Sequence, residues 1–220
     1  MQKIYYSLLI LVFLSVASCL AKITTAIGAT QSTLRNNGGK RTLGQYIGIG
    51  FEANPYSFLL GFEMAFVAKN VLLTNKTWPS DVYWQTNKFV MKGDIPINGS
   101  YWESCLKIGY KISLLHNRFS IGGYVGPMIS KQIDYTEEFR NVKTIPLSNE
   151  EIGKYNYDFH RYDSENFPFT VNRIIGGGLY YKNMGIEARL VKSYTKQDCF
   201  HGLFIQDYLD SAYLLFIYKI

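Results

Sequence analysis

The sequence predicts an all-β fold, an eight-stranded antiparallel up-and-down transmembrane β-barrel. Apolar and polar residues alternate with period two over stretches of more than ten residues. Strands of soluble sheets are usually about five or six residues long. The stretches number eight, an even number, and the connections between them are alternately short and long. Bacterial outer-membrane barrels combine these features, with the short turns on the periplasmic side.

The composition limits the kinds of protein that the chain can be. It has 220 residues, 47% hydrophobic and 18% charged, which suits one folded domain and not a disordered tail. With only 3 His and 3 Cys, we expect no metal, no other cofactor and no disulfide-stapled scaffold. The 23 basic and 17 acidic residues are spread along the chain without a basic run, which argues against nucleic acid as a partner.

Residues 1–21 have the organisation of an export signal, which leaves residues 22–220 for the barrel domain. One positive charge precedes an apolar run from Ile4 to Val16, and small residues follow it. The run is too short to span a bilayer comfortably, so no transmembrane helix is expected. Two processing outcomes stay open, because the residues before Cys19 also resemble a lipoprotein signal: cleavage after Ala21, or lipidation at Cys19.

Eight segments are the expected strands. They cover residues 21–33, 42–53, 56–69, 100–113, 118–131, 168–181, 184–196 and 210–220. Tight turns are expected at 54–55, 115–117 and 182–183, and longer, polar loops at 34–41, 70–99, 132–167 and 197–209. Strand parity puts the tight turns on the side of both chain termini, which is periplasmic, and the longer loops outside the cell.

Each segment has an apolar face and a face that carries polar groups. Leu60 and Phe62 alternate with Glu63, for example, and Trp102 lies at one end of an apolar stripe with Leu and Ile in its middle. Soluble sandwiches alternate too, but aromatic ends around an aliphatic middle are typical of a lipid-facing stripe between interfacial girdles. Arg173 is a cation on the apolar face, so we expect either a position near the outer rim or a bulge that turns it inward.

Five short motifs follow one another in the order of the expected strands. They are AIGATQST at 26–33, YWE…KIGY at 101–110, GGYVGP at 122–127, GGGLYY at 176–181 and GIEARL at 185–190. In this order they resemble successive strands of the PorT-like, porin-family outer-membrane β-barrel proteins. The resemblance covers nearly the whole chain after the export signal. It implies an outer-membrane barrel and leaves the activity open.

The last segment supports the same interpretation. Every second residue back from the terminus is apolar or aromatic, in the set Ala212, Leu214, Phe216, Tyr218 and Ile220. The pattern resembles the signal read by the barrel-assembly machinery, although such strands favour a terminal Phe. The alternative is the final strand of a soluble barrel.

Charged residues on the face opposite the lipid are the main candidate site. They are Glu63, Glu103, Lys107, Lys111, Glu187 and Arg189. Side chains can fill the interior of an eight-stranded barrel, and unpaired charges there would be costly to desolvate. We therefore expect a paired network in a filled lumen, with a narrow passive pore as the alternative.

Catalytic and covalent sites are weakly indicated. A lipid-modifying enzyme would need a nucleophile, a base and an orienting group within hydrogen-bond reach. The candidates lack a nucleophile motif, so we expect loop histidines and no enzymatic activity; these candidates are His116, His160, His201, Ser164, Asp163 and Asp207. Cys105 points inward and Cys199 opens the last outer loop, and separate thiols are expected, because a bridge needs their Cα atoms within about 7 Å.

The longest expected loop, 132–167, is the candidate contact region. Acidic residues alternate there with the aromatic residues Phe139, Tyr155, Tyr157, Phe159 and Tyr162. Loops of this length are usually functional or disordered, and both possibilities stay open.

Together these features predict a non-enzymatic surface or scaffold protein in the outer membrane of a gram-negative bacterium. The expected partners are outer-membrane lipid, lipopolysaccharide and the barrel-assembly machinery. Three alternatives remain: a narrow passive pore, a lipid-modifying barrel enzyme, and a soluble secreted lipocalin-like barrel that binds a small apolar ligand in its lumen.

Overall fold

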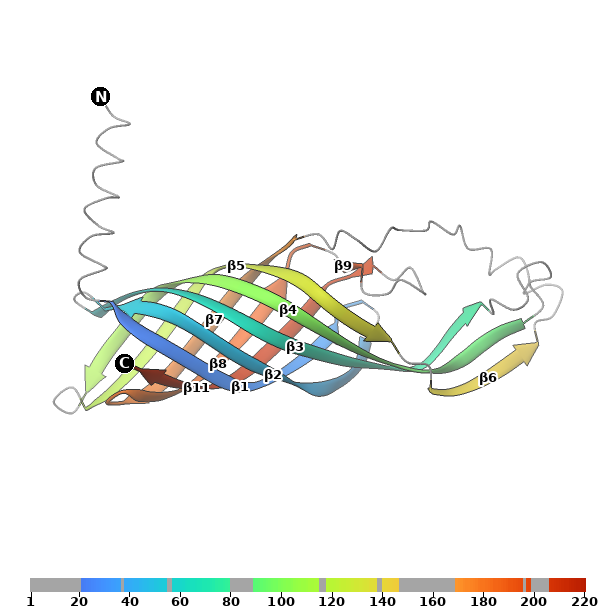
Figure 1. Ribbon diagram of the computed structural model, residues 1–220, viewed down its shortest axis with the longest axis horizontal. Coiled ribbons are helices and arrows are strands. Elements are labelled where there is room, and N and C mark those ends of the chain that lie inside the picture. The colour runs from blue at the N-terminus through green and yellow to red at the C-terminus, as the bar shows by residue number, and fades with distance from the viewer. Residues whose placement is uncertain are drawn as a thin grey trace, which may run out of the picture.

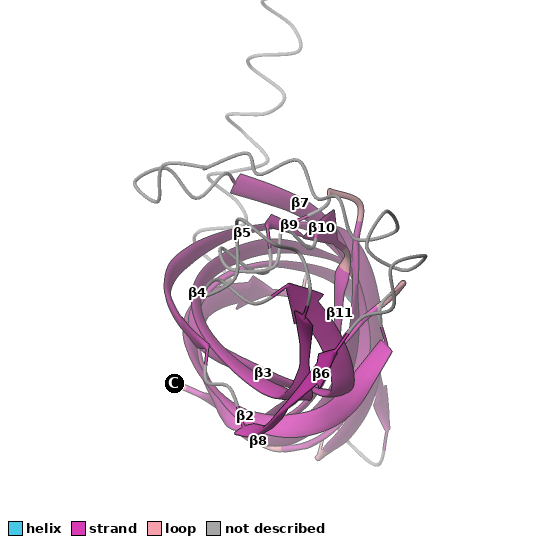
Figure 2. Ribbon diagram, turned by 90° about the vertical axis from the view of Figure 1, so that its right-hand side faces the viewer, coloured by secondary structure: helices cyan, strands magenta, loops and turns pink. Residues whose placement is uncertain are grey.

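Eight long antiparallel strands close into a ring in the computed structural model (Figures 1 and 2). The structure describes residues 21–36, 38–54, 57–79, 89–114, 118–137, 140–146, 169–195, 197–198 and 206–220. The ring strands are β1 (Lys22–Leu34), β2 (Gly38–Ala53), β3 (Phe58–Pro79), β4 (Phe89–Leu114), β5 (Phe119–Glu137), β7 (Phe169–Tyr181), β8 (Met184–Ser193) and β11 (Leu209–Lys219).

Ring closure follows from the order in which the strands pair. Neighbours run β3-β2-β1-β11-β8-β7-β5-β4, and β4 pairs again with β3. Apart from the β1–β11 pair, which joins the two ends of the barrel chain, each strand pairs with the next ring strand along the sequence. The predicted eight-stranded up-and-down barrel is confirmed. No helix in the described residues is long and apolar enough to cross a membrane.

The period-two alternation sets which side chains face the lumen. On β8 exposed and buried residues alternate without interruption from Met184 to Ser193. On β3 Phe62 is 39% exposed, whereas Glu63, its neighbour, is 2% exposed. Because successive side chains of a strand point to opposite faces, one register decides the position of every residue.

The loop predicted at 70–99 is wrong over most of its length. β3 continues to Pro79 and β4 begins at Phe89, and the two stay paired from Phe58–Tyr110 to Pro79–Val90. Val71, Leu73 and Ile95 lie inward along this extension and are buried. Asn and Lys residues around them gave the segment a polar composition, but the apolar alternation persists and the strands continue.

The other predicted loops also begin or end in strand. Residues 132–137 belong to β5, and β6 (Arg140–Pro146) pairs with β4 at residues 89–94. The connection between β1 and β2 is shorter than the predicted link at 34–41, because β1 ends at Leu34 and β2 begins at Gly38. In the predicted loop 197–209, β9 (Gln197–Asp198) pairs with β10 (Gln206–Asp207). The cause is the same, because polar residues on the wet side of a strand resemble a loop in composition.

A three-stranded arm therefore projects beyond the ring, on the right of Figure 1. We define the arm as residues 73–79 of β3, 89–96 of β4 and all of β6, where pairing with β2 and β5 has ended. The first residues of β1, the last residues of β11 and the tight turn at Lys182–Asn183 lie at the opposite end, which we name the tight-turn end.

Asp94 ties the three strands of the arm together. Its carboxylate accepts a hydrogen bond from the Asn75 backbone N–H (3.0 Å) and one from the Asn141 side-chain amide (2.9 Å). Asn75 and Asn141 have positive φ angles, and the register shifts beside Asn75 and beside Asp94. The hydrogen bond from Asn141, followed by that from Asn75, holds the pKa of the Asp94 carboxyl below its ordinary value.

Replacing Asp94 by alanine is expected to loosen the arm and leave the ring intact. Hydrogen–deuterium exchange should become faster in residues 73–76 and 140–146 and stay unchanged in β8. In the wild type the same loosening should appear as the pH falls through the lowered pKa of Asp94, because the ionised carboxylate is the acceptor. Unchanged exchange in the arm of Asp94→Ala would contradict this role.

Candidate functional site

Arg189 is the centre of an ion-pair network in the lumen. Its side chain is fully buried and forms ion pairs with Glu63 (2.5 Å) and with Glu187 (2.7 Å). Lys107 pairs with the same two carboxylates, at 2.5 Å from Glu63 and 3.7 Å from Glu187. β3, β4 and β8 supply these residues, so the network holds opposite walls of the ring together.

Tyrosine hydroxyls fill the remaining acceptor positions of the two carboxylates. Tyr124 and Tyr180 donate hydrogen bonds to Glu187 at 2.7 and 2.6 Å, and Tyr46 donates to Glu63. Buried ion pairs are stable only when hydrogen bonds satisfy the remaining lone pairs. The aromatic composition of the chain therefore serves the lumen as well as the membrane face.

Two smaller clusters lie on either side of this centre. Toward the arm, Lys69 pairs with Glu103 at 2.5 Å, and Tyr213 donates to the same carboxylate at 3.0 Å. Toward the tight-turn end, Glu52 pairs with Lys219 and with Lys111, the latter at 3.2 Å. The described lumen residues thus include four carboxylates (Glu52, Glu63, Glu103, Glu187) and five cations (Lys69, Lys107, Lys111, Arg189, Lys219) in ion pairs.

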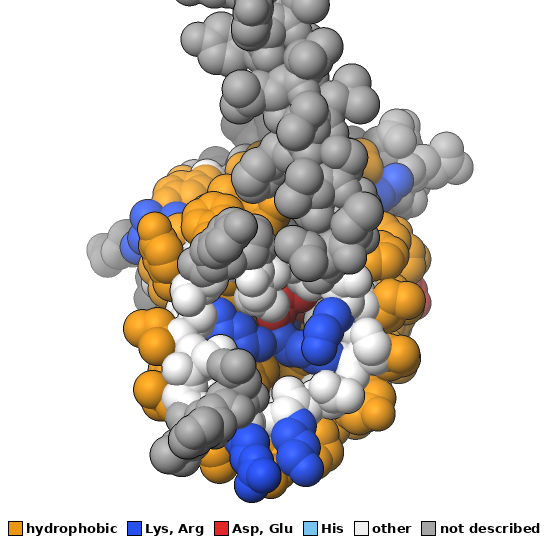
Figure 3. All heavy atoms as spheres, turned by 90° about the vertical axis from the view of Figure 1, so that its left-hand side faces the viewer, with side chains coloured by type: hydrophobic (Ala, Val, Ile, Leu, Met, Phe, Trp, Pro, Cys, Tyr) orange, Lys and Arg blue, Asp and Glu red, His pale blue; other side chains and the backbone are white. Residues whose placement is uncertain are grey.

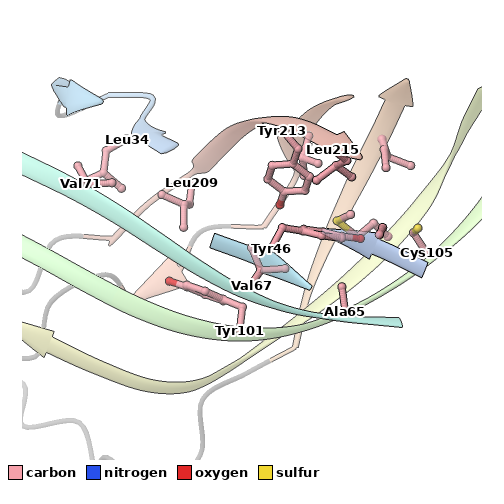
Figure 4. Close-up of a cluster of buried hydrophobic side chains, with 14 of the residues drawn as sticks. Leu34, Tyr46, Ala65, Val67, Val71, Tyr101, Cys105, Leu209, Tyr213 and Leu215 are labelled. Carbon is pink, nitrogen blue, oxygen red and sulfur yellow. The ribbon is translucent and has the colours of Figure 1, made fainter. Parts of the chain in front are cut away.

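Apolar side chains line the lumen on the arm side of the charges. Figure 4 shows Leu34, Val71 and Leu209 near one another, on the same side of the cluster as Tyr101. Ile97, Lys69 and Gln132 lie beside this group, and the cavity among these residues is only about 10 Å³. A single water needs roughly 10–15 Å³, so this cavity has room for one water molecule at most.

Two inward glycines make room for the network. A Cβ at Gly176 would lie 2.5 Å from the Tyr124 ring, and a Cβ at Gly178 would lie 2.8 Å from Cγ of Glu187. Glycine at positions 176 and 178 therefore allows neighbouring side chains to pack closely against this strand.

Gly176→Val is expected to lower the free energy of unfolding by roughly 1–3 kcal/mol, because the added methyl groups displace Tyr124 from Glu187. Urea unfolding in lipid vesicles measures the loss. Gly123→Val is the matched control, since Gly123 faces outward on the neighbouring strand and a Cβ there would meet only Gly176 O at 3.8 Å. Equal losses in both variants would contradict the crowding argument.

The structure brings the six predicted lumen charges into the interior. Glu63, Lys107, Glu187 and Arg189 form one network, whereas Glu103 and Lys111 belong to the flanking clusters. Three further inward charged residues, Glu52, Lys69 and Lys219, were not predicted. Each lies an even number of residues from other inward residues of its strand, so the period-two alternation was sufficient to predict its inward position.

The remaining candidates fall largely outside the described residues. These are the signal segment with Cys19, the loop aromatics Phe139, Tyr155, Tyr157, Phe159 and Tyr162, and the residues His116, His160, Asp163, Ser164, Cys199 and His201. Asp207 is described, is buried and accepts hydrogen bonds from the Asn36 backbone N–H at 3.0–3.1 Å. Cys105 is a buried free thiol. The described residues hold no metal-binding cluster.

The outward face of the ring is largely apolar, and Figure 3 shows hydrophobic side chains bordering the end of the barrel on both sides. Ile47, Ile108 and Leu214 are 60%, 44% and 61% exposed. At the tight-turn end aromatic rings pair across neighbouring strands, Phe58 with Tyr110 and Phe119 with Tyr181. An apolar exterior around a charged interior is the reverse of a lipocalin-like barrel, so the soluble alternative is wrong.

Comparisons with known proteins find solved structures of low similarity and no matching sequence. No family model matches the chain, and no curated protein sequence matches it. Ail, the attachment invasion locus protein of Yersinia pestis, is 12% identical with a TM-score of 0.41 over 91% of this chain and 99% of Ail. Neisserial surface protein A is 9% identical with a TM-score of 0.40, covering 91% and 97%.

A third solved structure is the N-terminal β-barrel domain of Pseudomonas aeruginosa OprF. It is 10% identical with a TM-score of 0.34, covering 89% of this chain and 97% of that domain. A closed ring of eight strands, an apolar exterior and an aromatic girdle make this chain an outer-membrane β-barrel protein of a gram-negative bacterium.

Proposed function

We propose that the chain is a non-enzymatic surface protein of the PorT-like kind, whose barrel is a rigid scaffold for the arm and the outer loops. The observation that carries this proposal is the arm, which extends the sheet beyond the apolar exterior. Within the described residues, β6 pairs on one side only, with β4. An unpaired strand edge is a template for a partner that adds a further strand.

The orientation of the barrel decides whether the arm meets partners outside the cell. We assign the tight turns to the periplasm and the arm to the exterior, as short turns and long connections are placed in outer-membrane barrels. Lipopolysaccharide is the expected partner at the same exterior surface in this proposal. The barrel-assembly machinery reads the last strand from the periplasm.

Cysteine labelling of intact cells tests this orientation. In a background with Cys105→Ser and Cys199→Ser, Val142→Cys places an exposed thiol on β6 and Asn183→Cys places one in a tight turn. A membrane-impermeant maleimide should label the first variant in intact cells and the second only after the outer membrane is permeabilised. The opposite pattern would overturn the proposal.

A closed lumen predicts that the protein does not conduct ions. The ion pairs around Arg189 and the apolar residues toward the arm leave little room for a continuous water column. Purified protein in planar bilayers should show no stable open state. Reproducible single-channel steps would favour the narrow pore. If these steps were lost when Gly99 on the arm side is replaced by a bulky residue, the ion path would lie in the lumen.

A further inference from the structure

A recess lies on the outside of the barrel, toward the arm end. It is a groove of about 260 Å³ across β1, β2, β8 and β11. Its lining residues are Gln31, Thr33, Arg41, Leu190, Val191, Lys192, Asp210, Ser211 and Ala212. We name it the rim groove. It belongs to neither the lumen network nor the arm.

Small side chains form the floor of the rim groove. Gln31 pairs with Ala212, and Ala212 pairs with Leu190, in one row of residues across three strands. Leu190 is 64% exposed and stands as an apolar wall beside the smaller Ala212. The apolar part of the groove therefore continues the lipid-facing exterior of the ring.

Two cations without a described partner line the same groove. Arg41 and Lys192 are exposed and form no ion pair with a described residue. Asp210, the groove's one acid, is already neutralised, because Arg35 donates to its carboxylate at 2.6 and 3.0 Å. The groove thus carries an uncompensated charge of about two positive units next to an apolar wall.

Arg173 extends this positive region along the rim. It pairs with Lys192 across the β7–β8 ladder and is exposed, and no register shift interrupts β7 at this point. Of the two positions predicted for Arg173, the inward position needs a bulge, and the β7 pairings contain none. The position near the outer rim therefore remains. The row at this level presents Lys192 and Arg173 side by side on the outward face.

We propose that the rim groove binds the phosphorylated headgroup of a membrane lipid, with phosphate between Arg41 and Lys192 and an acyl chain against Leu190. Arginine and lysine at the edge of an apolar face match an anionic headgroup above its hydrocarbon. In the orientation proposed above, the groove faces the outer leaflet, and its ligand is a phosphorylated glycolipid of the lipid A class. The assignment of the groove to the outer leaflet rests on the proposed function. The binding of a phosphorylated headgroup by the groove does not depend on it.

Native mass spectrometry of the purified full chain in detergent, titrated with diphosphorylated lipid A, tests the proposal independently of orientation. Arg41→Gln with Lys192→Gln should weaken retention of lipid A by about tenfold or more, as expected for the loss of a charge-assisted hydrogen bond. Arg118→Gln with Lys182→Gln is the matched control, which removes two exposed cations at the tight-turn end. It should leave retention unchanged.

Two further measurements distinguish a lipid phosphate from free inorganic phosphate. Dephosphorylated lipid A should bind the wild type about as weakly as lipid A binds the double variant, and millimolar inorganic phosphate should not displace lipid A. Equal losses in both double variants, no loss in either, or displacement by free phosphate would each overturn the proposal. Labelling of Val142→Cys only in permeabilised cells would instead overturn the orientation and leave the groove chemistry standing.

Discussion

Replacing Arg189 by methionine is expected to lower the free energy of unfolding of the barrel by roughly 3–5 kcal/mol. The change leaves Glu63 and Glu187 buried with one cation, Lys107, where two are present now. Each carboxylate is at most 2% exposed and cannot recover its hydration. Reversible urea unfolding of the refolded protein in lipid vesicles, followed by tryptophan fluorescence, measures the loss.

Arg173→Met is the matched control for this prediction. It removes the same side chain from an exposed position on the outward face, where no carboxylate depends on it. We expect its free energy of unfolding to stay close to that of the wild type. A loss at Arg173 as large as the loss at Arg189 would show that the lumen network is not what the arginine stabilises.

A quadruple variant separates the cost of unpaired acids from the value of the ion pairs. Arg189→Met and Lys107→Met with Glu63→Gln and Glu187→Gln remove both cations together with the two carboxylates that they neutralise. This variant should be more stable than Arg189→Met alone, because replacing a whole buried ionic group is often nearly neutral. A further loss on adding the other three changes would mean that Lys107 and the tyrosines already compensate the acids.

The inward and outward faces were readable from the sequence because alternation with period two determines them locally. Glu63 and Phe62 required no knowledge of any other strand. The partners of each charge were not readable, because Glu63 meets Arg189 only when ring closure brings β3 and β8 to the same lumen. Contacts across a closed ring join residues far apart in sequence, so the pattern on one strand does not encode them.

The arm was missed for a different physical reason. Beyond the membrane a strand needs no apolar outward face, so Asn70, Asn75 and Lys76 on β3 resemble a loop in composition. The inward residues Val71 and Leu73 still alternate, and they are buried. One apolar face is enough to continue a hairpin, and along these residues that face is the inward one instead of the lipid-facing one.

Ile108→Arg is expected to destabilise the barrel by roughly 2–4 kcal/mol in lipid, the cost of an arginine on the lipid face near the bilayer midplane. Ile108 is 44% exposed on β4, opposite Leu60 and Val125 and between the exposed Tyr110 and Trp102.

Val171→Arg provides the comparison at the arm-end rim. Val171 faces outward like Ile108, but it lies two residues from Arg173 and close to Phe169, the first residue of β7. An arginine there should cost only about 0–1 kcal/mol, because the free-energy cost of an arginine on the lipid face is small near the interface. Urea unfolding of both variants in the same vesicles measures the difference. Equal costs would place Ile108 and Val171 at the same depth and would contradict the register in which the ring crosses the membrane.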